Sequence, residues 1–175
     1  KDKITELQSS GMSKMIIDLR DNPGGVLDEA CNMADMILPE GIITYTETKS
    51  GKRTDYNSDA ESLDIPIVIL INENSASASE VFTGALKDYG KATVVGKKSY
   101  GKGIVQSVLP FYDGSGMSLT VAKYYTPNGT CIHGIGIEPD VEVDMPDEYK
   151  DMYASMVEHD KDTQLQKAIE IIKEK

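Results

Sequence analysis

Three serines alternate with two alanines between Ser75 and Ser79, and Glu80 follows them directly. A buried-strand pattern precedes this run at residues 65–72 and a helical pattern follows it, so the sequence predicts a serine hydroxyl at the N-terminus of a helix. Unpaired backbone N–H groups and the helix dipole stabilise developing negative charge at such a position. The chemistry that this arrangement suits is acyl transfer through a serine.

The spacing leaves two questions about this run open. Successive helical residues turn by ~100°, so Ser75 and Ser79 share one face while Ser77 points roughly the opposite way, and the pattern does not select the nucleophile. Ser77 followed three residues later by Glu80 also fits a capping box, which is a purely structural motif.

A serine nucleophile needs a general base, and the two histidines of the chain are poor candidates. His159 lies in a charged stretch, which favours a solvated side chain, and His133 lies beside glycines, which favours a loop position. The alternative base is a lysine whose ammonium is destabilised by burial, because desolvation lowers the pKa of a lysine towards neutral pH.

Lys102 is the lysine whose surroundings fit this role best. Gly101 and Gly103 flank it, and the absence of side chains lets the backbone approach other segments closely. Gln106 lies four residues further on in a strand pattern, and this even offset places its side chain on the same face as Lys102. Its amide oxygen is available to orient the lysine amine.

The same loop supports a rival interpretation. Residues 96–102 match G-x-x-x-x-G-K after a predicted strand, which is the first half of a phosphate-binding loop. Gly103, however, stands where a Ser or Thr would bind magnesium, and residues 104–109 have the pattern of a strand where the motif requires a helix. Nucleotide binding is therefore only a remote alternative.

Hydrophobic periodicity predicts that an α/β core with at least partly parallel strand pairing positions these residues. Strands are expected at residues 15–19, 42–45, 54–56, 65–72, 92–95, 104–109 and 117–125. Helices are expected at residues 27–38, 81–90 and 164–172, and an extended surface segment at 138–146. Strand, tight turn and helix follow one another at the serine run.

The composition excludes several classes of partner. The 175 residues include 18 Lys+Arg against 29 Asp+Glu, a formal net charge of −11 at pH 7, which disfavours nucleic acid and anionic membrane surfaces. The longest apolar stretch, residues 65–71, is far too short to span a bilayer. Cys31 and Cys131 are too far apart for a zinc cluster or a disulfide framework, and Cys31 falls on an apolar helix face. We expect neither a metal nor a cofactor.

Three segments resemble the carboxyl-terminal processing, or tail-specific, serine peptidases. They are residues 17–25, which read IDLRDNPGG, residues 74–80, which read NSASASE, and residues 96–106, which contain YGKGIVQ. Residues 124–129, 136–140 and 162–166 add weaker likeness. The order and spacing agree over nearly the whole chain.

This resemblance implies roles for individual residues. It implies that Ser77 is the nucleophile, that Lys102 is the general base and that Gln106 holds the lysine. It also implies a backbone oxyanion hole, for which we expect the N–H of Ala78 together with that of Gly24 or Gly25. The family pattern further includes an acidic residue at Asp88, but eleven helical residues separate it from Ser77 by ~16 Å along the axis, so we expect a structural ion pair there.

The resemblance also implies a crotonase/Clp-protease-like α/β spiral and an endopeptidase acting on proteins or peptides with accessible C-terminal tails. Residues 1–175 would then form the C-terminal protease core, in which residues 1–11 read as a helix, without the N-terminal helical segment and PDZ domain of the family. Relatives imply an extracytoplasmic location (periplasmic, cell-envelope or secreted), for which this chain carries no signal, and a homo-oligomer is possible. A non-catalytic fragment that binds peptide by strand addition is the second hypothesis.

Overall fold

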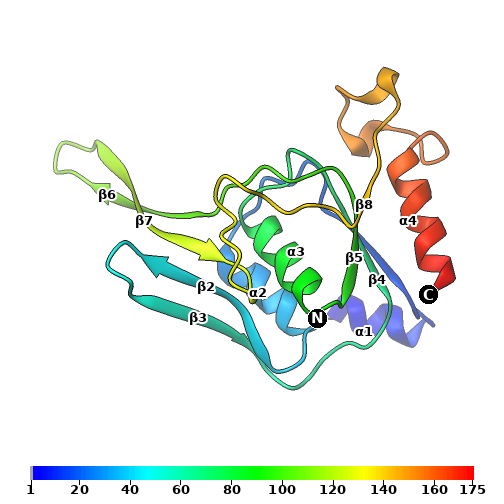
Figure 1. Ribbon diagram of the computed structural model, residues 1–175, viewed down its shortest axis with the longest axis horizontal. Coiled ribbons are helices and arrows are strands. Elements are labelled where there is room, and N and C mark those ends of the chain that lie inside the picture. Colours follow the sequence, from blue (N-terminus) through cyan, green and yellow to red (C-terminus); the bar gives the residue numbers. More distant parts are fainter. Residues whose placement is uncertain (1) are drawn as a thin grey trace.

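Two four-stranded sheets form the framework of the computed structural model, which describes residues 2–175 (Figure 1). The first sheet is parallel throughout, in the order β1 (Met15–Asp18), β4 (Ile67–Ile71), β5 (Ala92–Gly96) and β8 (Val141–Glu142). The second is antiparallel, in the order β3 (Arg53–Ser58), β2 (Gly41–Thr48), β7 (Gly116–Tyr125) and β6 (Ile104–Pro110). The predicted α/β class and the partly parallel pairing are confirmed.

The parallel sheet is covered on both faces. Ile67, Ile69 and Ile71 of β4 pack in one apolar cluster with α2 (Leu27–Asp35) and α3 (Ala78–Asp88). Val68 and Leu70 point to the other face, where α4 (Thr163–Glu174) covers them. Because both faces are covered, every residue of β4 is buried, which explains its uninterrupted apolar sequence.

Several elements differ in extent from the prediction; β2 continues to Thr48 where residue 45 was expected, and α3 begins at Ala78 where residue 81 was expected. The helix expected at residues 27–38 ends at Asp35; Met36 caps it with helical backbone angles, and the Met36 carbonyl accepts a hydrogen bond from the N–H of Leu63, outside the helix. The extended segment at residues 138–146 contains β8, which adds a fourth strand to the parallel sheet. The helix expected at residues 1–11 is α1 (Asp2–Ser9); residue 1 lies outside the described part.

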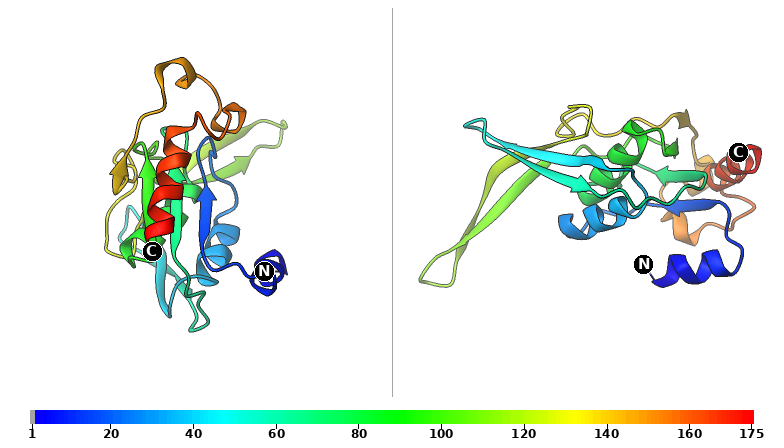
Figure 2. Two further views of the ribbon diagram at one scale, coloured as in Figure 1. Left: turned by 90° about the vertical axis from the view of Figure 1, so that its right-hand side faces the viewer. Right: turned by 90° about the horizontal axis from the view of Figure 1, so that it is seen from below.

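The hairpin of β6 and β7 extends as a long arm from the core (Figures 1 and 2). Its strand β6 begins at Ile104, two residues after Lys102. A strand therefore follows the glycine-rich loop where a phosphate-binding loop requires a helix, as the sequence predicted.

None of the helices within residues 2–175 combines the length and the apolar character that a bilayer crossing needs.

Candidate active site

Ser77 lies at the turn that connects β4 to α3, as the first residue before the helix. Its backbone has φ 57° and ψ −118°, a region that a non-glycine residue rarely adopts and that costs about 1–3 kcal/mol. Such strained residues cluster at functional sites. The serine hydroxyl is thus placed at a helix N-terminus, where the sequence predicted it.

Burial distinguishes the three serines that spacing could not separate. Ser75 is fully buried, and its hydroxyl donates to the carbonyl of Leu19 at 2.7 Å, so it ties the turn to the end of β1. Ser79 is buried inside the first turn of α3. Ser77 is half-buried, so among the three its hydroxyl is the most accessible to a substrate.

Glu80 connects the serine turn to the lysine loop. Its carboxylate is buried, with 1% of the residue exposed, and it accepts hydrogen bonds from four donors. One oxygen accepts from the Ser99 hydroxyl at 2.5 Å and from the Gly101 N–H at 2.6 Å. The other accepts from the N–H groups of both Ser77 and Lys102, each at 2.8 Å. The backbone nitrogens of Ser77 and Lys102 therefore lie at most twice that distance apart.

Sequence reasoning recognised Glu80 only as the partner of Ser77 in a capping box. That box is present, and its carboxylate also reaches the loop 22 residues further along the chain. The signal that could have revealed this role is a glutamate inside a run of small and apolar residues, because such a carboxylate must find several donors once it is buried.

The glycines around Lys102 allow the close packing that the sequence predicted. Gly101 has φ +88°, and a Cβ atom at Gly103 would lie 2.3 Å from the backbone nitrogen of His133. Both glycines are buried, whereas Lys102 between them is exposed. The expected burial of the lysine is therefore not present in this structure, because the loop turns its outer side to solvent.

Among the described residues, no hydrogen bond joins the three side chains proposed for catalysis. Gln106 is exposed in β6, two residues into the arm. The hydrogen bonds of the described residues include none between the Ser77 hydroxyl and Lys102, nor between Lys102 and Gln106. The structure brings the backbones of Ser77 and Lys102 together, without a direct hydrogen bond between their side chains among the described residues.

The backbone N–H groups of Ala78, Gly24 and Gly25 were expected to form an oxyanion hole, and the structure shows which of them already have acceptors. Ala78 is the first residue of α3, so its N–H has no acceptor within the helix. The N–H of Gly24 donates to the Asn22 side chain at 3.0 Å, whereas that of Gly25 makes no hydrogen bond to the described residues. Of these two glycine N–H groups, that of Gly25 is the one without an acceptor among the described residues.

The turn that carries these glycines packs directly on the serine. A Cβ atom at Gly24, which has φ +98°, would lie 2.8 Å from the Ala78 nitrogen and 2.9 Å from Ser77 Cβ. Only glycine fits this approach. A mostly apolar cavity of about 180 Å³ opens beside it, and its lining residues include Gly24, Gly25, Val26, Glu29, Ala30, Met33, Ala78 and Phe82.

Other charged groups lie apart from this arrangement. Asp88 is at the far end of α3 and accepts a hydrogen bond from the N–H of Asn128 at 2.8 Å; its role is structural, through a hydrogen bond where an ion pair was expected. Within residues 2–175 no group of three or more His, Cys, Asp or Glu side chains is arranged to hold a metal ion.

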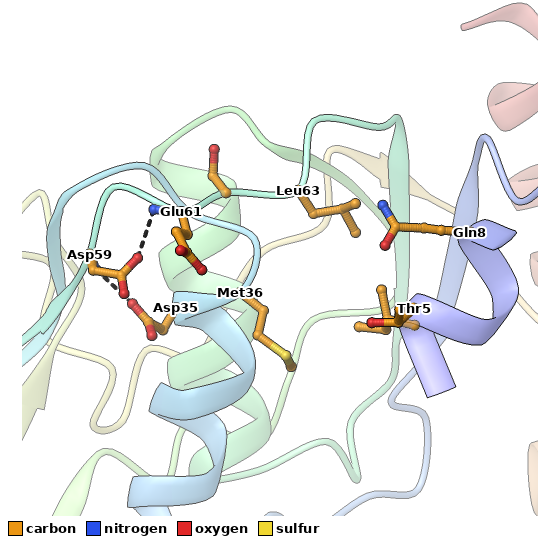
Figure 3. Close-up of a pocket in the computed structure, with 9 residues that line it drawn as sticks. Thr5, Gln8, Asp35, Met36, Asp59, Glu61 and Leu63 are labelled. Carbon is orange, nitrogen blue, oxygen red and sulfur yellow. Dashed lines mark hydrogen bonds between the residues drawn. The ribbon is translucent and has the colours of Figure 1, made fainter. Parts of the chain in front are cut away.

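A second cavity of about 210 Å³ lies between α1 and the segments that follow α2 and β3 (Figure 3). Thr5 and Gln8 line one side, and Asp35 and Asp59 the other, where the N–H of Asp59 donates to Asp35 at 2.7 Å. It shares no lining residue with the cavity beside Ser77.

Known proteins are similar to this chain in both sequence and fold. The profile of peptidase family S41 matches residues 1–143. The "Probable CtpA-like serine protease" of Staphylococcus aureus is 50% identical over 151 residues, which are 83% of this chain and 30% of that protein. The protein of the same name from Staphylococcus epidermidis is 46% identical over 151 residues, again 83% of this chain and 30% of that protein.

Among solved structures, the photosystem II D1 C-terminal processing protease is similar with a TM-score of 0.77 and 39% identity, covering 83% of this chain and 39% of that one. The chain spans about 30% of the length of the curated relatives it matches.

Proposed function

The chain belongs to peptidase family S41, as its motifs predicted, and on this premise we propose that it is the catalytic core of a serine endopeptidase that uses a Ser77/Lys102 dyad. The observation that carries the proposal is the buried Glu80 carboxylate, one oxygen of which accepts from the N–H groups of both residues. The side chain of Lys102 is long and flexible. With the backbones of Ser77 and Lys102 held this close, it is long enough for Nζ to reach the Ser77 hydroxyl.

The reaction begins when the neutral amine of Lys102 takes the proton of the Ser77 hydroxyl. The alkoxide attacks the carbonyl carbon of a peptide bond, and the N–H groups of Ala78 and Gly25 stabilise the oxyanion. Collapse of this intermediate breaks the C–N bond, and the departing amine takes the proton from Lys102. Water then attacks the acyl-enzyme, with Lys102 again as the base, and releases the second product and Ser77. Gln106 orients the amine through its amide oxygen.

A substrate contributes to this chemistry by covering the lysine. Lys102 is exposed in the chain, and a polypeptide lying across the site would remove water from it and favour the uncharged amine. Activity should therefore require an extended substrate.

The cavity beside Ser77 suggests which substrates fit. Its walls are mostly apolar and it adjoins both proposed oxyanion donors, so it would receive an apolar side chain next to the scissile bond. We propose that the substrates are proteins or peptides with accessible C-terminal tails, in line with the name of the D1 C-terminal processing protease. The proposal places the protein outside the cytoplasm, which fractionation of cells followed by immunoblotting would test.

The experiment is to incubate the full-length protein with an unfolded substrate that ends in an apolar tail, and to follow cleavage by mass spectrometry. Ser77→Ala and Lys102→Ala should each abolish cleavage, whereas Ser107→Ala, an exposed serine of β6, should leave it unchanged. Cleavage that persists in Ser77→Ala or in Lys102→Ala would refute the dyad. Peptide binding without cleavage by the wild-type protein would favour the non-catalytic alternative.

A further inference from the structure

Arg20 is a buried cation two residues beyond the end of β1. Its side chain is 2% exposed, and all five of its N–H donors have acceptors. Nε and one Nη2 donor bind Asp18, the second Nη2 donor and one Nη1 donor bind Asp162, and the remaining Nη1 donor binds Gln164. Burial alone would lower the pKa of Arg20, but hydrogen bonds and charge from Asp18 and Asp162 raise it above its ordinary value. The guanidinium is therefore held in one position.

Asp162 joins this cation to the C-terminal helix. Its carboxylate makes a two-pronged pair with Arg20, at 2.7 and 2.9 Å, and its side chain is also 2% exposed. The same residue is the N-cap of α4 and accepts the N–H of Leu165 at 2.9 Å. The start of α4 is thus tied to the end of β1, although 142 residues separate the two partners in sequence.

Asp21, the next residue, makes a second link from this turn to the C-terminal segment. It has φ 59°, and its carboxylate accepts from the side chains of Asn72 and Asn74 and from the N–H of Ala154, all at 2.8–2.9 Å. Asn72 and Asn74 belong to the connection that leads to Ser77. The turn after β1 is therefore held between the serine turn on one side and residues beyond 150 on the other.

This turn carries the glycine that supplies an oxyanion donor. The carbonyl of Asn22 accepts the N–H of Ala76 at 3.0 Å, and its side chain accepts the N–H of Gly24. Arg20 and Asp21 therefore anchor a turn that leads within four residues to Gly24, whose backbone packs against Ala78, and to Gly25 after it.

We propose that Asp162, acting through Arg20, is a positioning residue that sets the distance between the Gly25 N–H and the Ser77 hydroxyl. The C-terminal segment, beyond the residues 1–143 matched by the family profile, is on this view part of the apparatus that shapes the oxyanion hole. The catalytic part of this inference rests on the proposed function.

Asp162→Asn is the variant that isolates the ion pair. Asparagine has nearly the same size and caps helices as well as aspartate, so α4 keeps its N-terminal hydrogen bond. Of the two charges that hold Arg20, that of Asp162 is lost and that of Asp18 stays. A donor that contacts only the oxyanion affects kcat more than KM, and complete loss of such a donor lowers kcat by a factor of about 10²–10³. Displacement of the Gly25 N–H should have a smaller effect than its complete loss, lowering kcat about tenfold while KM changes less than twofold.

The control is Ile172→Ala, which loosens α4 without touching the ion pair, because Ile172 is buried in the apolar cluster between α4 and the parallel sheet. Both variants of the full-length protein are assayed for peptide cleavage and thermal unfolding. We expect a tenfold lower kcat only in Asp162→Asn, even where Ile172→Ala lowers the Tm as much. An unchanged kcat, or equal losses in both variants, would overturn the inference.

Amide hydrogen exchange separates this inference from the proposed function. Exchange in a peptide covering residues 19–26 should be several-fold faster in Asp162→Asn than in wild type or Ile172→Ala, and this result does not depend on activity. If wild type shows no Ser77-dependent cleavage, the proposed function fails while faster exchange still supports the structural link. Unchanged exchange in Asp162→Asn would refute the link itself.

Discussion

Replacing Glu80 by glutamine keeps the size of the side chain and removes its charge. Four donors converge on the two carboxylate oxygens, and two of them bind each oxygen. A glutamine amide offers one acceptor oxygen, so two buried donors lose their acceptor at about 1–3 kcal/mol each. We expect Glu80→Gln to lower the free energy of unfolding by about 4 kcal/mol, which corresponds to a Tm lower by roughly 10 °C for a chain of this size.

The assay is urea unfolding followed by circular dichroism, together with cleavage measured well below the lowered Tm. Glu73→Gln is the matched control, because Glu73 is an exposed glutamate in the same connection between β4 and α3. That control should stay within about 0.5 kcal/mol of wild type. In Glu80→Gln the folded fraction should also lose activity, since the amide can accept from only one of the two donor pairs and the Ser77 turn and the Lys102 loop are no longer both fully held. A variant within 1 kcal/mol of wild type, with normal cleavage, would refute this reasoning.

Three further predictions follow from the packing and the charges. Gly103→Ala should lower stability by about 2 kcal/mol or more, measured by urea unfolding, because its Cβ would meet the His133 backbone; a neutral effect would contradict the close approach. Burial, with the charge of Asp28, raises the pKa of the Cys31 thiol to about 11, so at pH 8 iodoacetamide should label Cys131 first in the folded protein, as mass spectrometry would show; equal rates would contradict this. Burial acts to raise the pKa of Asp21, but its hydrogen bonds lower that pKa below its ordinary value. The stabilising effect of the Asp21 carboxylate is therefore complete at neutral pH and is lost as the pH falls through the lowered pKa. The stability difference between wild type and Asp21→Asn should accordingly shrink in acid, and a constant difference would argue against the sign of this shift.

Local patterns were sufficient to predict the elements that carry the site. The apolar run at residues 65–72 marked the central strand because a strand covered on both faces has no polar positions. The small residues and the Ser77/Glu80 spacing then marked the start of α3. The Lys102 loop followed from its flanking glycines, which do approach neighbouring backbone closely.

Features that depend on distant segments could not be predicted in this way. Ser75 is excluded as an accessible hydroxyl because it binds the Leu19 carbonyl, 56 residues earlier, and spacing within the serine run contains no trace of that contact. The pairing of Arg20 with Asp162 likewise joins residues at opposite ends of the chain. The strand β8 has two residues, too few to show a periodicity, and forms because the edge of β5 is available.

The central claim is that Ser77 becomes acylated with Lys102 as its base, and covalent labelling tests it most directly. The full-length protein is treated with a fluorophosphonate, the mass of the intact protein is followed over time, and the modified residue is located by peptide mapping. The account predicts one adduct per chain at Ser77, formed at least a hundredfold more slowly in Lys102→Met. An adduct on another residue, no adduct on the wild-type protein, or an unchanged rate in Lys102→Met would contradict it.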